Sequence, residues 1–176
     1  MQRGQTMSKD AVAREGQERA IKVFTAKPAL AQSVNSGRAT VEDGLACTYQ
    51  QGDKTAVLDM PGAMGGSETG PTPGFFGRAG VTGCLAIGIK MTALRKGLSI
   101  SKITVDIEQD FDDRGVFGFE GVPSTPSDTR VKIHIDGDHD EATLRGLVDE
   151  AITSDPWFLA YRDAQPVAVS VEKAGT

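Results

Sequence analysis

The fold is decided by one stretch of sequence, PGFFGRAGVTGCLAIGIKMTALRK at residues 73–96. Pro73 suits the first position of a helix, because its missing N–H would have no partner there. Gly97 directly after the stretch is a typical helix stop. We therefore predict a long helix over residues 73–96, either continuous or with a break. The glycine- and proline-rich residues 61–74 before it predict a loop.

Cys84 is the one credible reactive group of the chain, and the helix gives it two interpretations. If the helix restarts at Thr82-Gly83, Cys84 lies in a first turn, where unpaired amides lower the pKa of a thiol and favour the nucleophilic thiolate. On a continuous helix, Gly80, Cys84 and Gly88 form a stripe of small residues against which another backbone can pack. Cys84 is then a small residue in tight packing. The residues alone leave both interpretations open.

A β-hairpin is predicted before the loop. Leu45, Cys47 and Tyr49 share one face at a period of two, which is typical of a half-buried strand. Gln51-Gly52-Asp53 is a turn, and Thr55–Leu58 leads the partner strand back. Cys47 therefore faces the core, and a structural role is favoured over a catalytic one.

Two strands and a second helix are predicted after the long helix. Apolar residues alternate with polar ones in both strands, at Ile103, Val105 and Ile107 and at Val131, Ile133 and Ile135. Asp138 caps the second helix, with Glu141 completing a capping box. Asp155-Pro156 ends it, because proline disfavours the α conformation of the residue before it. The apolar stripe of this helix is Leu144, Leu147, Val148, Ala151 and Ile152.

The two ends of the chain differ in character. Residues 1–20 are polar and helix-compatible with little to bury, and Ile21–Ala26 is either a short strand or the end of that arm. At the other end, Val167, Val169 and Val171 alternate as a closing strand. The predicted organisation is a partly ordered N-terminal arm at residues 1–36 and an α+β domain at residues 37–176.

Composition and missing motifs exclude several functions. The net charge of −5 argues against binding nucleic acid or an anionic membrane surface. The start lacks the apolar core of a signal peptide, and two cysteines are too few for a secreted disulfide framework, so we expect a cytoplasmic setting. The acidic runs at residues 110–115 and 136–141 do not fit a calcium loop, and His134 and His139 have no partner at zinc-ligand spacing. No phosphate-binding loop or serine-hydrolase elbow is present. We expect no metal and no cofactor.

One ordered set of short motifs resembles the OsmC/Ohr family, the osmotically inducible and organic hydroperoxide resistance proteins. The set is Asp59-Met-Pro, Gly65-Gly66, Gly70-Pro-Thr-Pro73 and then Cys84. The similarity extends from about Gly37 to Val171. No single one of these motifs is specific to the family, whereas the order in which they follow one another along the chain is.

The resemblance implies an intertwined homodimer in which strands wrap around two long central helices. It also implies a cysteine peroxidase, an oxidoreductase that acts on organic hydroperoxides in the oxidative stress response without metal or haem. The reactive thiolate becomes a sulfenic acid, and a second cysteine condenses with it. The reductant is a lipoyl-bearing protein or another dithiol.

Carried over residue by residue, the resemblance assigns the peroxidatic role to Cys84 and thiolate stabilisation to Arg38. Two expected residues are different here. Gly74 stands where the family has a glutamate after Pro73, and Asp155 stands where the family has its second cysteine. Aspartate forms no disulfide, and an aspartate near Cys84 would raise the pKa of the thiol by like-charge repulsion.

Three hypotheses follow. In the first, Cys84 attacks a hydroperoxide, Arg38 stabilises the thiolate and an external thiol resolves the sulfenic acid. In the second, the dimer is not catalytic and binds a small apolar or electrophilic ligand in an interfacial pocket lined by Cys84. In the third, Cys47 is a displaced resolving cysteine.

Overall fold

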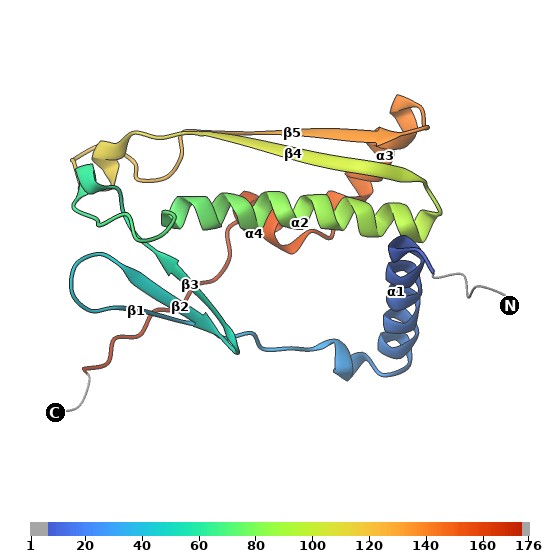
Figure 1. Cartoon of the computed structure of the whole chain (residues 1–176), viewed down its shortest axis with the longest axis horizontal. Helices are drawn as coiled ribbons and strands as arrows, with labels where there is room; N and C mark the ends of the chain where they lie inside the picture. The colour runs from blue at the N-terminus through green and yellow to red at the C-terminus, as the bar shows by residue number, and fades with distance from the viewer. Residues whose placement is uncertain (1–6, 174–176) are drawn as a thin grey trace, which may run out of the picture.

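The computed structural model describes residues 7–173, which form an α+β fold of two antiparallel sheets and four α-helices (Figure 1). One sheet has the order β1-β2-β3 and the other pairs β4 with β5. The strands are β1 (Arg38–Val41), β2 (Cys47–Gln51), β3 (Lys54–Leu58), β4 (Ile100–Asp110) and β5 (Asp128–Gly137). The helices are α1 (Lys9–Ala26), α2 (Pro73–Lys96), α3 (Glu141–Ile152) and α4 (Pro156–Arg162). Short 3-10 turns lie at Pro28–Ala31, Gly62–Met64 and Asp113–Gly115.

Helix α2 is the centre of the fold, and in Figure 1 it runs between the β4–β5 sheet and the β1–β3 sheet. Thr72 caps its start by accepting a 3.3 Å hydrogen bond from the Phe75 amide, and Pro73 occupies the first turn. Gly97 ends it with a φ of 71°, a left-handed conformation that glycine adopts without strain. The helix is continuous, so the predicted long helix is confirmed and the alternative of a restart at Thr82-Gly83 is wrong.

The core lies where α2, β4 and α3 meet. Its fully buried members are Ile89, Ala93, Ile100, Leu147 and Ala151, with partly buried aliphatic side chains of β4, β5 and α3 packed against them. Strand β4 pairs with β5 so that Val105 faces Ile133. The two predicted strands and the apolar stripe of the second helix are therefore confirmed.

The ends of the second helix differ from the prediction. Asp140, and not Asp138, caps α3, and it accepts a 2.7 Å bond from the Thr143 amide. The reason is that β5 continues to Gly137, so Asp138 belongs to the turn that follows it. After α3 the chain starts a further short helix, α4, which the sequence analysis missed.

The predicted strand at Val167, Val169 and Val171 is wrong. All three side chains are exposed, and this part of the chain has no regular structure. A strand forms only where it pairs with a neighbour through backbone hydrogen bonds. Within residues 7–173, no strand of the same chain pairs with this segment.

Helix α1 contacts the C-terminal half of α2. Asp10 forms a 2.8 Å ion pair with Lys90, and Gln17 accepts a 2.7 Å bond from Arg95. No residue of α1 is fully buried. The alternative of a strand at Ile21–Ala26 is wrong, because these residues end the helix. Of the helices in residues 7–173, none combines the length and the apolar character needed to cross a membrane.

Candidate functional site

Cys84 is half-buried on α2. The residues that join α3 to α4 lie beside it. The backbone amide of Trp157, in the first turn of α4, lies where it lowers the pKa of the Cys84 thiol by favouring the thiolate. The carboxyl group of Asp155, the cap of α4, lies near enough to the same sulfur to raise the pKa of the thiol. Two groups more than seventy positions away in sequence therefore act on this thiol.

Asp155 is buried, with 3% of its surface exposed. Its Oδ1 atom accepts a 2.8 Å hydrogen bond from the Phe158 amide and so caps α4. Its Oδ2 atom is buried and has no hydrogen-bond partner of ordinary geometry among residues 7–173. A Cβ atom placed on Gly88, one turn after Cys84, would lie 3.2 Å from this Oδ2. Asp155 Oδ2 therefore packs against the part of α2 that carries Cys84.

This setting raises the pKa of the Cys84 thiol. The largest cause is burial, which disfavours the charged thiolate. Asp155 raises the pKa further, as a hydrogen-bond acceptor and through its negative charge, whereas the Trp157 amide lowers it by stabilising the thiolate. The predicted repulsion by Asp155 is confirmed. Cys84 lies in the middle of the continuous α2, so the alternative in which a first turn activates the thiol is wrong. The raised pKa favours the protonated thiol at neutral pH.

Arg38 lies in β1, opposite Gln50 of β2. It lines a shallow surface hollow at the end of the hairpin, with Ser36, Gly37, Gln50 and Gly52. Arg38 is not among the groups that shift the pKa of Cys84. Its role as the partner of the thiolate stays a prediction.

Gly74 leaves room for an arginine that the sequence analysis did not single out. A Cβ atom on Gly74 would lie 3.1 Å from Nη1 of Arg78, one turn further along α2. The guanidinium of Arg78 therefore covers the position where the family resemblance places a glutamate. The spacing of four residues on a helix is the signal that could have found this pair.

Cys47 lies in β2, in register with Leu58 of β3 and Val41 of β1. Its side chain is half-buried, in agreement with the predicted strand face. Cys47 and Cys84 are both free thiols.

Asp59 orders the loop before α2, and the sequence analysis assigned it no role. It is 2% exposed and accepts bonds from the amides of Met60 (2.7 Å), Ser67 (3.2 Å) and Thr69 (3.0 Å). The Thr69 hydroxyl adds a 2.8 Å bond. The bonds from Thr69 are the main cause that lowers the pKa of Asp59. Gly70 lets the loop backbone pass close to β3, because a Cβ atom at this position would lie 2.3 Å from the Val57 carbonyl oxygen.

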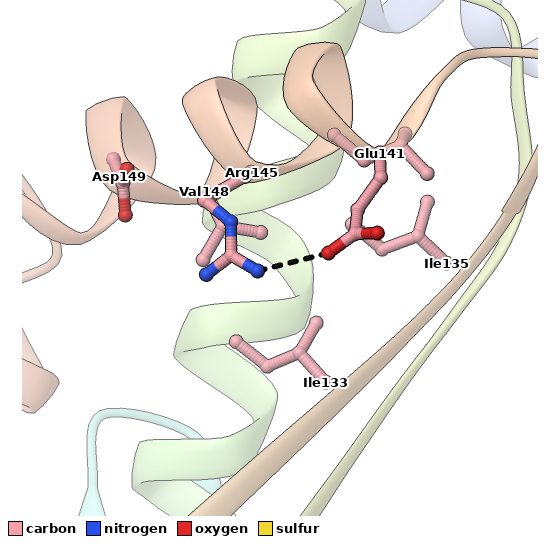
Figure 2. A pocket seen from close by; sticks show the side chains of 7 residues that line it. Ile133, Ile135, Glu141, Arg145, Val148 and Asp149 are labelled. Carbon is pink, nitrogen blue, oxygen red and sulfur yellow. Dashed lines mark hydrogen bonds and ion pairs between the residues drawn. The ribbon is translucent and has the colours of Figure 1, made fainter.

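Among the hollows that border the β4–β5 sheet, two lie beside α3 and α4. The α3 hollow, of about 340 Å³, lies between β5 and α3, and the Glu141–Arg145 ion pair of 3.0 Å borders it (Figure 2). The α4 hollow, of about 360 Å³, is lined by Val81, Ile107, Thr129, Val131, Phe158, Tyr161 and Arg162. Neither is lined by Cys84 or Arg38. The lining of the α4 hollow includes Val81, on the turn of α2 before Cys84, and Phe158, which follows Trp157.

No group of three or more His, Cys, Asp and Glu side chains in the described part of the chain is arranged to hold a metal ion. His134 is exposed and lies 3.5 Å from Asp106 on the neighbouring strand.

Comparison with known proteins identifies the family. The sequence model of the family described as OsmC-like protein matches residues 65–161, more than half of the chain. The chain belongs to the OsmC-like family. Among curated protein sequences, no significant match was found.

Solved structures share the fold at low sequence identity. An OsmC-like protein from Mycoplasma pneumoniae has a TM-score of 0.63 and 14% identity, over 74% of this chain and 89% of that chain. An organic hydroperoxide resistance protein from Elizabethkingia anophelis has a TM-score of 0.57 and 14% identity, over 74% and 89%. An organic hydroperoxide resistance protein, OsmC, from Legionella pneumophila has a TM-score of 0.54 and 19% identity, over 74% and 90%.

Proposed function

We propose that the protein reduces organic hydroperoxides through Cys84, with an external thiol as the resolving group. The observation that carries this proposal is the placement of the Trp157 amide, which favours negative charge on the Cys84 sulfur and lowers the pKa of the thiol. The family supports the chemistry, since proteins of this fold include those named for organic hydroperoxide resistance.

In the proposed reaction, the Cys84 sulfur bonds to the terminal peroxide oxygen and the O–O bond breaks. The products are a sulfenic acid on Cys84 and an alcohol. An external dithiol, free or on a lipoyl-bearing protein, then condenses with the sulfenic acid and releases water. Its second thiol frees Cys84 as the dithiol becomes a disulfide.

We propose that the working unit is an intertwined homodimer built around two copies of α2. One face of α2 supports this, because a Cβ on Gly80 or on Gly83 would meet nothing within 4 Å. Ile87, on the same face, is 62% exposed, and Met91 is exposed as well. Arg38 is assigned to thiolate stabilisation in the assembled dimer. The division into an arm of residues 1–36 and a domain of residues 37–176 stays a prediction.

A second candidate function is binding without catalysis. The raised pKa of Cys84 favours it, because a protonated thiol is a poor nucleophile. The α4 hollow, lined mainly by apolar side chains, has room for a small apolar or electrophilic ligand. The third candidate is a disulfide between Cys47 and Cys84, which are both free thiols here, and it is kept as an outcome of the test.

The test is a single-turnover oxidation of the purified protein by cumene hydroperoxide. Mass spectrometry follows the oxidation state of each cysteine, with dimedone to trap sulfenic acid and Cys84→Ser as the control. Rapid dimedone labelling of Cys84 supports the peroxidase. A Cys47–Cys84 disulfide supports the third candidate. Oxidation of Cys84 no faster than that of free cysteine refutes both enzymatic functions.

A further inference from the structure

Asp155 presents one feature that helix capping does not explain. Capping of α4 uses Oδ1, which accepts the Phe158 amide at 2.8 Å. The second oxygen, Oδ2, is buried and has no partner of ordinary geometry among the described residues. A buried carboxylate oxygen without a hydrogen bond is costly, so each one in a native protein needs an explanation, of which a catalytic role is one.

The position of Oδ2 indicates what it acts on. It lies against Gly88, one turn after Cys84, and the Asp155 carboxyl group is near enough to the Cys84 thiol to raise its pKa. Of the groups within residues 7–173 that shift the pKa of this thiol, Trp157 supplies a backbone amide and Asp155 is the one ionisable group. Cys84 is protonated at rest, so its attack on any electrophile requires an acceptor for the thiol proton.

We propose that Asp155 is the general base of the Cys84 reaction and the general acid that protonates the leaving group, which rests on the function proposed above. As the sulfur bonds to the terminal peroxide oxygen, the thiol proton passes to Asp155 Oδ2. The electron pair of the O–O bond leaves on the alkoxide, which takes the proton from Asp155 and departs as an alcohol. The terminal oxygen keeps its hydrogen, so Cys84 becomes a sulfenic acid, oxidised by two electrons. The Trp157 amide stabilises the charge that develops on sulfur.

Asp155→Asn separates this role from simple repulsion. Asparagine keeps the size of the side chain and an oxygen to cap α4, but it removes both the charge and the base. Two rates are measured on each protein at pH 7: alkylation of Cys84 by iodoacetamide, which reports the thiolate fraction, and single-turnover oxidation by cumene hydroperoxide. We expect alkylation to become faster and peroxide oxidation to become at least tenfold slower, because general acid–base catalysis contributes about a hundredfold or more. Asp155→Glu is expected to restore part of the peroxide rate.

The contrary result is equally clear. If Asp155→Asn speeds alkylation and peroxide oxidation in parallel, Asp155 only repels the thiolate and the proposal is wrong. Asp155→Ser, which also caps helices well, serves the same comparison if the asparagine variant does not fold. If wild-type Cys84 reacts no faster than free cysteine, the proposed peroxidase itself fails. If peroxide oxidises Cys84 faster than free cysteine in the wild type and equally fast in the Asp155 variants, only the proposed role of Asp155 is refuted.

Discussion

Replacing Gly88 by alanine tests the contact on which the chemistry of Cys84 depends. Inside a helix, this replacement stabilises a protein by about 1 kcal/mol, because glycine has more conformational freedom to lose. At Gly88 the added methyl group would lie 3.2 Å from Asp155 Oδ2, closer than an ordinary van der Waals contact. The carboxylate must then move, although the 2.8 Å bond to Phe158 and its burial hold it in place.

The two effects are of similar size. Full loss of a helix cap costs about 1 kcal/mol, so a shift of Asp155 by a few tenths of an ångström that weakens its bond to Phe158 offsets the gain from alanine. We expect the stability of Gly88→Ala to lie within a few tenths of a kcal/mol of wild type. Gly146→Ala is the matched control, because Gly146 is an exposed position inside α3 where a Cβ would meet nothing within 4 Å. We expect this control to gain about 1 kcal/mol, or about 2–4 °C in Tm for a chain of this length.

Urea denaturation of the three proteins gives the comparison, at one protomer concentration because association would shift apparent stability. Alkylation of Cys84 across pH is measured in parallel. Moving Asp155 away from the sulfur lowers the pKa of the thiol in Gly88→Ala and leaves it unchanged in Gly146→Ala. Equal stabilisation by both substitutions, with an unchanged thiol pKa, would show that Asp155 is not lodged against Gly88.

Three further predictions follow from the same contacts. Asp155→Cys, treated with peroxide, is expected to form a disulfide with Cys84, seen as a loss of two thiols by mass spectrometry; persistent sulfenic acid alone would contradict the closeness of the two side chains. Gly74→Glu is expected to stabilise the protein by about 1 kcal/mol, through helix propensity and a negative charge in the first turn beside Arg78, and Gly74→Gln in the same melting experiment should gain less. Asp59 has a lowered pKa, so its contribution to stability is present above its ordinary value of 3.8 and is lost as the pH falls through the folded value. Asp59→Asn should therefore raise the protease sensitivity of residues 59–72 at pH 7 and reduce the acid dependence of unfolding.

Most of the fold follows from local patterns. Pro73 and Gly97 marked both ends of α2 because each acts through its own backbone conformation, and the alternation around Val105 and Ile133 marked β4 and β5. The prediction of a closing strand was wrong because strand formation depends on a partner as well as on the local pattern. The alternation of Val167 and its neighbours satisfies the local pattern, but pairing requires a sheet edge that the described chain does not offer to this segment.

The candidate site was predicted only in part. Cys84 was identified from its surroundings in α2, and Asp155 was recognised as a carboxylate in an unexpected position. The sequence analysis treated Asp155-Pro156 as the end of a helix and missed that the same residues begin α4. The positions of Asp155 Oδ2 and of the Trp157 amide relative to Cys84 depend on the angle at which α4 meets α2. That angle comes from tertiary packing, which no local pattern encodes.

Asp155 connects the stability of α4 to the chemistry of Cys84 in a way that a cysteine could not. Aspartate is among the best residues at the start of a helix, whereas cysteine is not. With a cysteine at this position, the sulfenic acid on Cys84 could be resolved within the chain, but α4 would lose the bond from the Phe158 amide. With aspartate, α4 keeps its cap and Cys84 gains a proton acceptor, and the resolving thiol must come from another molecule. A small dithiol that reaches the half-buried Cys84 should therefore limit the rate of turnover, and the steady-state rate should rise linearly with its concentration while the rate of sulfenic acid formation stays constant.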